Sequence, residues 1–384
     1  MRVLFDLEAT QPNSSGARHG GGRYGEILFR CLVDRGVPVS AFYNSGLWFN
    51  PQLHEFINER AIPLYDHSVE NLHSIIRQDS STMLYSPLPT RTSEIYGMSD
   101  CKVLGTIHDL RLLETPLDSY FWRYRDVRFK ERIRFLIMKY LPHLGYRKYI
   151  SRYGSLNNNP NFNFVTVSQH SSAAFRSWFV QYKDREIPVF YSPSTVIGKA
   201  VERHYYEKFY LLVSGNRWEK NNLRAIMALD RLFTMGYLNG AVVRITGVTR
   251  PTAFRYRFRN PDRFCFMGYV NDTELDQLYH DAYALIYPSL NEGFGYPPLE
   301  AMSYGVPVVA SPFTSITEVC GDGALYFNPF SVEEIMGRLL QLEDSKAYNN
   351  CSKLALKRYA MVLKRQKADL DGLADYIVKL AKEN

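Results

Sequence analysis

The sequence predicts an α/β protein with two doubly wound domains, on two observations. Apolar runs of strand length alternate with helical stretches along most of the chain, separated by polar or glycine-rich turns, which is typical of βαβ units with parallel sheets. The chain has 384 residues, 46% of them hydrophobic, which is enough for two α/β domains at ~150 residues each. Each half can therefore form one doubly wound unit.

Composition narrows the class of protein further. No apolar run approaches the ~20 residues that cross a bilayer, and the first ten residues predict a strand rather than a signal peptide. Five scattered cysteines without C-x-x-C spacing predict reduced thiols in a cytoplasmic protein. The net charge of +7 fits a nucleic acid, a membrane surface or an anionic ligand. Since no zinc-finger, RNA-recognition or helix-turn-helix signature is present, we expect no nucleic-acid partner.

The first predicted βαβ unit carries a glycine cluster. Residues 3–9 are predicted to form a strand, residues 11–25 a polar loop, and residues 23–36 a helix. Gly20, Gly21 and Gly22 fall just before the helix, where free N–H groups can bind phosphate. The cluster is not G-x-G-x-x-G, so a loop that is merely flexible is the alternative.

A histidine follows a later strand of the same domain. Residues 101–107 predict a strand that ends at His108 and Asp109. A lone histidine at a strand end is more often structural, but ligands of open α/β sheets bind outside the carboxyl ends of strands. Residues 187–194 are predicted to be the last strand of the first domain, and residues 195–208 the linker.

Residues 119–153 are unusually basic, with ten Lys or Arg and only two acids. Apolar side chains fall on one face of a predicted helix within this segment: Phe129, Ile133, Leu136, Ile137 and Tyr140. One interpretation is a helix packed on its own domain with a solvated basic rim. The other is docking to an anionic membrane surface.

The second domain opens with a strand over residues 209–215 and a helix near Asn221 and Asn222, which can cap it. Arg217 and Lys220 lie between the two, at the carboxyl end of the strand. Two cations beside a helix N-terminus favour a diphosphate site, and the alternative is a pair of solvated charges.

The most informative stretch runs from Ala284 to Ser311. It predicts a buried strand, a glycine loop, a short helix beginning near Pro297 and ending at Gly305, and a second strand. The loop glycines and the helix N-terminus suit an anionic ligand. Glu292 and Glu300 bracket the loop, and their carboxylates suit the hydroxyls of a sugar or ribose, because like charges repel phosphate.

The sequence EGFGYPPLEAMSYGVPVVAS, with seven residues between Glu292 and Glu300, resembles the signature of glycosyltransferase family four. The alternative is an ordinary βαβ turn with two surface glutamates. The resemblance covers the second domain, and in the first it rests on the glycine loop and on T-I-H-D-L. It implies the GT-B fold, in which two doubly wound Rossmann-like domains face each other across a cleft.

The resemblance also implies domain limits and residue roles. The domains are expected at 1–194 and 209–355, with C-terminal helices over 356–384 that cross back to the first domain; the family's Phe-x-Trp motif is missing, which leaves the crossing point open. The catalytic residues are expected to be Glu292 at the donor sugar, His108 over it, and Lys220 and Arg217 at the diphosphate. The donor-binding residues are expected to be Gly20, Gly21, Gly22, Gly268, Tyr269, Val270, Gly293, Phe294, Gly295 and Glu300.

The expected reaction moves a hexosyl group, of mannose or rhamnose type, from a nucleotide diphosphate sugar to a glycan or lipid-linked acceptor, with retention, in the cytoplasm at the inner face of a bacterial membrane. No cofactor or metal is expected, since the D-x-D sequence at Asp369 and Asp371 falls in a helical tail. UDP and GDP donors and the oligomeric state stay open. Two alternatives are a non-catalytic nucleotide-sugar-binding module, which would lack His108 or Glu292, and a dehydrogenase, which would need G-x-G-x-x-G after a strand.

Overall fold

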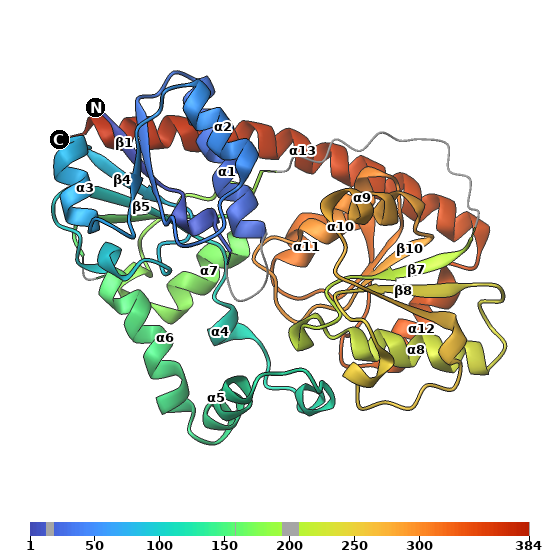
Figure 1. Ribbon diagram of the computed structural model, residues 1–384. Coiled ribbons are helices and arrows are strands. Elements are labelled where there is room, and N and C mark those ends of the chain that lie inside the picture. The colour runs from blue at the N-terminus through green and yellow to red at the C-terminus, as the bar shows by residue number, and fades with distance from the viewer. Residues whose placement is uncertain (13–18, 158, 194–206, 384) are drawn as a thin grey trace. The chain divides into compact units, whose positions relative to one another are not determined.

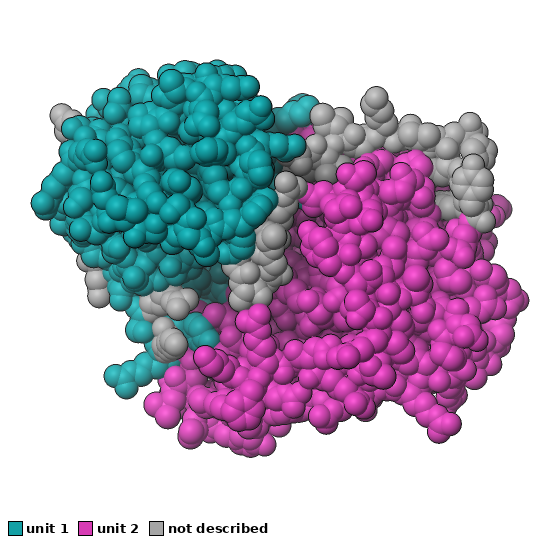
Figure 2. All heavy atoms as spheres, in the orientation of Figure 1, with its two compact units in different colours: residues 1–110, 147–195, 364–384 teal, residues 111–146, 196–363 magenta. Residues whose placement is uncertain are grey.

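The computed structural model describes residues 1–12, 19–157, 159–193 and 207–383, and it shows two compact units (Figures 1 and 2). The first unit comprises residues 1–110, 147–195 and 364–384, and the second comprises 111–146 and 196–363. Most of the expected linker, residues 195–206, lies outside the described residues.

The first unit is built on a parallel sheet with the strand order β3-β2-β1-β4-β5-β6, of which Figure 1 labels β1, β4 and β5. This is the doubly wound order of dinucleotide-binding domains, and its direction reverses between β1 and β4, where such sheets bind ligands. The strands are β1 (Val3–Asp6), β2 (Val39–Tyr43), β3 (Leu64–Asp66), β4 (Met83–Ser86), β5 (Lys102–Ile107) and β6 (Phe162–Thr166).

In the described part of this unit, four helices lie between successive strands, as in βαβ crossovers: α1 (Gly20–Asp34), α2 (Pro51–Glu59), α3 (Leu72–Asp79) and α6 (Pro142–Asn157), the last of which belongs to this unit from Arg147 on. A 3₁₀ turn (Ser93–Gly97) lies between β4 and β5, and α7 (Gln169–Trp178) follows β6.

Two expectations for this unit need correction. The helix α1 begins at Gly20, so the three glycines form its first turn rather than the loop before it. Residues 187–193 form no strand: Val189 makes only one bridge, to Thr166, through Pro188 O and Phe190 N–H. Pro188 has no N–H for a longer ladder, which explains why the apolar run does not become a strand.

The second unit repeats the same architecture. Its parallel sheet has the order β12-β11-β10-β7-β8-β9, which in chain order is again the doubly wound arrangement, with the reversal between β7 and β10. The strands are β7 (Phe209–Leu212), β8 (Val242–Thr246), β9 (Phe264–Gly268), β10 (Ala284–Tyr287), β11 (Val308–Ala310) and β12 (Ala324–Tyr326).

One of the principal helices of the second unit, α13 (Ser345–Lys382), continues into the first unit. The others are α8 (Asn222–Thr234), α9 (Asp272–Asp281), α10 (Tyr296–Ser303), α11 (Ser315–Cys320) and α12 (Val332–Gln341). The helix α13 belongs to the second unit as far as Leu363 and to the first from Lys364 on. It begins earlier than the expected C-terminal helices at 356–384. Among the described residues, no helix is both long and apolar enough to cross a membrane.

Residues 111–146 were expected in the first domain but belong to the second unit. They contain α4 (Arg111–Glu114), a 3₁₀ turn (Ser119–Arg123) and α5 (Phe129–Tyr140). Asp118 forms a buried ion pair with Arg224, and the Tyr124 hydroxyl accepts a hydrogen bond from Leu223 N–H at 3.1 Å. Tyr124 also forms an antiparallel bridge with Phe254. These contacts attach the segment to the N-terminal turn of α8 and to the loop at Phe254.

Candidate active site

The loops after β7 and β10 lie together at the switch point of the second sheet. The Leu290 N–H donates to the carbonyl of Glu219 at 2.8 Å, and the Asn221 side chain donates to the carbonyl of Pro288 at 3.2 Å. These bonds hold Lys220 of the first loop against Glu292 of the second. A doubly wound sheet is expected to bind its ligand at this position.

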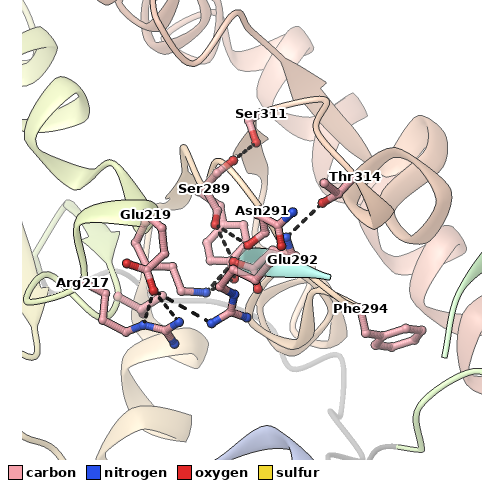
Figure 3. Close-up of polar contacts among 12 residues, drawn as sticks. Arg217, Glu219, Ser289, Asn291, Glu292, Phe294, Ser311 and Thr314 are labelled. Atoms are coloured by element: carbon pink, nitrogen blue, oxygen red, sulfur yellow. Dashed lines mark hydrogen bonds and ion pairs between the residues drawn. The ribbon is translucent and has the colours of Figure 1, made fainter. Parts of the chain in front are cut away.

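Lys220 and Glu292 form a buried ion pair, with 6% and 7% of each residue exposed. The Lys220 ammonium also donates to the hydroxyl of Tyr287 at 2.9 Å, and that hydroxyl donates to Glu292 Oε1 at 2.7 Å. Ser289 donates to the same carboxylate oxygen, as Figure 3 shows. The carboxylate is therefore held by one cation and two hydroxyls.

The surroundings shift both pKa values of this pair. Burial raises the pKa of Glu292, but the charges of Lys220 and Arg111 and the hydrogen bonds outweigh burial and bring the pKa down to about 2. Burial lowers the pKa of Lys220 to about 8, because the attraction of Glu292 only partly offsets burial and the repulsion of Arg217 and Arg111. Glu292 stays ionised over the physiological range, and Lys220 is the group that titrates near its upper end.

Two arginines complete a cationic cluster. Arg217 donates from Nη2 and Nε to Glu219 Oε1 at 2.7 and 3.0 Å (Figure 3). Arg111 Nη1 lies 3.9 Å from the same oxygen. Three cations thus meet two carboxylates at the strand ends, which leaves a positive balance suited to a polyanion. Arg111 was missed from the sequence, because its only signal would have been a tertiary contact across more than a hundred residues.

The glycine loop leads into α10 as expected from the sequence. Gly295 has φ +103° and precedes the helix, a conformation that favours glycine, and Pro297 lies in the first turn. Phe294 is buried, and in Figure 3 its ring points away from Glu292. Glu300 is also buried, in the second turn of α10.

Two hydroxyl-bearing residues after β11 form hydrogen bonds to this loop. The sequence analysis did not predict them. The Glu292 N–H donates to Thr314 Oγ1 at 2.9 Å (Figure 3). Ser315 Oγ donates to the carbonyls of Glu292 and Phe294 at 2.9 and 3.1 Å. These bonds position Glu292 through its backbone.

The expected nucleobase residues lie at the edge of the sheet. Gly268 ends β9 with φ +71°, followed by Tyr269, 77% exposed, and by the half-buried Val270. The strand β8 separates β9 from β7, so these residues sit at a distance from the ion pair along the same row of strand ends. Gly293 and Gly295 are in the glycine loop itself, beside Glu292.

In the first unit, His108 lies just after β5 and is half-buried. Its Nε2 lies 2.9 Å from the carbonyl of Pro87, which can only accept, so Nε2 carries the hydrogen and Nδ1 is the acceptor of the neutral ring. Burial lowers the pKa of His108 to about 4. The ring stacks edge-on with Tyr24 at 4.8 Å, and Ser171 Oγ donates to the His108 carbonyl at 2.8 Å.

A second histidine, missed from the sequence, caps the glycine turn. His19 Nδ1 accepts a hydrogen bond from Gly22 N–H at 3.0 Å, and Nε2 lies 3.1 Å from the carbonyl of Gln11. Burial lowers the pKa of His19 as well. A Cβ at Gly22 would lie 2.8 Å from the carbonyl of Thr10, which explains the glycine there. Histidine is an uncommon cap, so the sequence offered little to identify it.

Within the described part of the chain, no group of three or more His, Cys, Asp or Glu is placed to hold a metal ion. The two aspartates of the D-x-D sequence have structural partners instead. Asp369 accepts from Tyr191 N–H at 2.8 Å, and Asp371 pairs with Arg35 at 3.1 Å.

Comparison with solved structures identifies the class of fold. The whole chain superimposes on sucrose-phosphate synthase from Thermosynechococcus elongatus with a TM-score of 0.70 at 14% identity, over 99% of both chains. It superimposes on Anabaena HepE in complex with UDP-glucose with a TM-score of 0.62 at 14% identity, over 98% of this chain and 100% of that one. With two six-stranded doubly wound sheets, the fold is GT-B, as predicted.

Sequence comparison identifies the domain. Residues 199–358 match the family model "Glycosyl transferases group 1", so the second unit carries a group 1 glycosyltransferase domain. The chain is 51% identical over 76 residues to "O-antigen chain mannosyltransferase B" of Escherichia coli, which is 20% of each protein. It is 34% identical over 124 residues to "O-antigen chain mannosyltransferase RfbU" of Salmonella typhimurium, 31% of this chain and 34% of that protein. The matches thus span a fifth to a third of these relatives' own length.

Proposed function

We propose that the protein is a retaining glycosyltransferase that moves a hexosyl group, of mannose or rhamnose type, from a nucleotide diphosphate sugar to a hydroxyl of a glycan or lipid-linked acceptor in bacterial polysaccharide biosynthesis. The observation that carries the proposal is the buried Lys220–Glu292 pair at the switch point of the second sheet. The group 1 domain and the mannosyltransferase relatives support the reaction class and the type of sugar.

The donor diphosphate binds to the cationic cluster. Lys220, Arg217 and Arg111 supply positive charge at the strand ends. The N-terminus of α10 adds the positive end of its helix dipole but few N–H groups, because Pro297 and Pro298 lie in its first turn. The same charges stabilise the negative charge that grows on the leaving diphosphate. Because these three cations can balance the charge of the diphosphate, the proposed reaction needs no divalent metal.

Glu292 faces the donor sugar. Its described hydrogen bonds from Lys220, Tyr287 and Ser289 all end on Oε1, so Oε2 is the oxygen that accepts from sugar hydroxyls. Since the low pKa keeps this carboxylate ionised, it also stabilises positive charge near the anomeric carbon. Glu300 binds the ribose hydroxyls, and Gly268 to Val270 meet the nucleobase.

In the first unit, a neutral His108 lies over the donor sugar, and the first turn of α1 meets the diphosphate. The ring offers Nδ1 as an acceptor because Nε2 is used by Pro87. With no enzymic nucleophile assigned, the acceptor hydroxyl attacks on the face that the diphosphate leaves. The leaving phosphate takes the hydroxyl proton, so no general base from the protein is needed.

The test is a donor assay on the purified full chain. UDP, GDP and ADP sugars are offered with a soluble glycan acceptor, and release of the nucleoside diphosphate is measured with Glu292→Gln as the inactive control. We expect release with one class of nucleotide and glycosylated product by mass spectrometry, with the anomeric configuration retained by NMR. Tight donor binding by calorimetry without turnover on any acceptor would instead identify a non-catalytic binding module.

A further inference from the structure

The helix α5 is apolar on two sides, and one side anchors it to the second unit. Phe135 and Met138 are 4% and 7% exposed. The Phe135 ring stacks on Phe121 at 4.3 Å and meets Trp218 edge-on at 6.2 Å. These contacts hold the helix in place, so its remaining apolar residues are not needed for packing there.

The opposite side of α5 is exposed and strongly apolar. At about 100° per residue, its large side chains fall within an arc of roughly 100°, centred almost opposite Phe135 and Met138. Phe129 is 76% exposed and Tyr140 67%. The surface continues with Leu141, 54% exposed between α5 and α6, and with Leu144, 58% exposed in the first turn of α6. The α5 surface is defined by these exposed side chains: Phe129, Ile133, Leu136, Ile137, Tyr140, Leu141 and Leu144. Such a contiguous patch marks an interaction site.

Basic residues surround this surface. Residues 123–147 hold eight Lys or Arg and two acids. By helical position, Lys130 lies on one flank of the apolar arc, and Arg132 and Lys139 lie on the other. The ammonium of Lys139 lies 5.3 Å from the centre of the Tyr140 ring. One of the acids, Asp126, lies 3.5 Å from Arg250.

We propose that the α5 surface docks the protein on an anionic phospholipid bilayer. An interfacial helix places large apolar and aromatic side chains at the acyl boundary and its basic flanks among acidic headgroups, and α5 has both features. A second copy of the chain is a poorer occupant, because two such surfaces would bring like charges together. The inference deepens the proposed function, since a lipid-linked acceptor lies at a membrane. It is tested without the transfer reaction, so either can fail alone.

The experiment is co-sedimentation of the full chain with vesicles of phosphatidylcholine alone or mixed equally with phosphatidylglycerol. We expect partitioning onto the anionic vesicles only, weakening as salt is raised and the Debye length shortens. Replacing Phe129, Tyr140 and Leu144 by Ser tests the apolar arc, and replacing Lys130, Arg132 and Lys139 by Glu tests its flanks. Each triple change should weaken partitioning at least about tenfold, since one basic residue near acidic lipid accounts for about fivefold.

A matched control makes the same change of charge elsewhere. Lys346, Lys353 and Lys357 are exposed on α13 in the same unit, and their change to Glu should leave most of the partitioning in place. Circular dichroism and thermal melting check the fold of each variant, and transfer to a soluble acceptor should stay at wild-type rate. No partitioning by the wild type, equal loss in the control, or a dimer in light scattering that the Ser variant dissociates would each overturn the proposal.

Discussion

The two units share one strand order but differ in the charge of the groups at their strand ends. In the second unit, Lys220 and Glu292 form a buried ion pair, with two arginines beside it. In the first unit, burial lowers the pKa values of His19 and His108, so these two histidines are neutral near pH 7, and the charged Arg91 lies 3.5 Å from His19. In our proposal, the strand order determines where the ligand binds in each unit, and these residues determine whether charge or neutral hydrogen bonding holds it.

The largest expected effect comes from neutralising the carboxylate in the second unit. Glu292→Gln keeps the shape but removes the charge that faces the anomeric carbon, so kcat should fall on the order of 10²- to 10³-fold. The free nucleoside diphosphate should still bind, but more weakly near neutral pH, because the Glu292 charge raises the pKa of Lys220 and its loss lowers that pKa further. Glu333→Gln, which removes a carboxylate that is 70% exposed, is the control and should change kcat by less than about twofold. Normal turnover by Glu292→Gln would remove the residue from the site.

A smaller effect is expected from the neutral group of the first unit. His108→Ala should lower kcat/KM by about ten- to a hundredfold while leaving the affinity for the free diphosphate unchanged, because the proposed contact is with the sugar. Since the pKa of His108 is about 4, the wild-type rate should show no step from this group near neutral pH. A step near the ordinary histidine pKa that disappears in the variant would contradict the neutral assignment.

Arg111 tests the role of charge in the second unit. It was assigned to the cationic cluster from the structure and not from the sequence. Arg111→Ala should weaken binding of the nucleoside diphosphate about tenfold, as for one lost charge-assisted contact, and Arg111→Lys should restore part of it. Isothermal calorimetry measures both. Arg250→Ala, a change at an exposed arginine paired with Asp126, serves as the control. Equal affinity in Arg111→Ala and the wild type would leave Arg111 a structural residue.

The smallest expected effect is that of metal removal. Since protein cations balance the diphosphate, EDTA should change the transfer rate by less than about twofold. The rate is measured before and after exhaustive treatment with EDTA, then with added Mg²⁺ or Mn²⁺. Loss of turnover with EDTA and its return with Mn²⁺ would show that the cationic cluster does not replace a metal.

Local sequence patterns predicted the fold class and several of the residues on which this comparison of the two units depends. Glycines and prolines mark the loop around Glu292, and polar residues after an apolar run mark Lys220, because each depends on the conformation of a few neighbouring residues. The α/β class followed from the same alternation of apolar runs and turns.

Contacts between distant segments could not be predicted in this way. Asp118 and Arg224 are 106 positions apart, and their ion pair helps assign residues 111–146 to the second unit. The cap on α1 is a histidine, which is not a usual capping residue, so the glycine turn looked like a loop. The apolar side chains of α5 left two interpretations open, since burial of Phe135 and exposure of Phe129 depend on which side meets the second unit.

The central claim is that the second unit holds the donor diphosphate by charge, through Lys220. The direct test is calorimetry of the free nucleoside diphosphate at a series of pH values from about 7 to 9.5, for the wild type and Lys220→Ala. Only protonated Lys220 attracts the diphosphate, and its pKa in the free protein is lowered to about 8, so wild-type affinity should be highest below this pH. Above it, affinity should fall by up to about tenfold per pH unit.

In Lys220→Ala the affinity should be on the order of a hundredfold lower at neutral pH, and the fall near pH 8 should be absent, since the titrating group is gone. Lys208→Ala, which removes a partly exposed lysine paired with Glu343, should behave like the wild type. The same affinity and the same pH profile in Lys220→Ala as in the wild type would contradict the account.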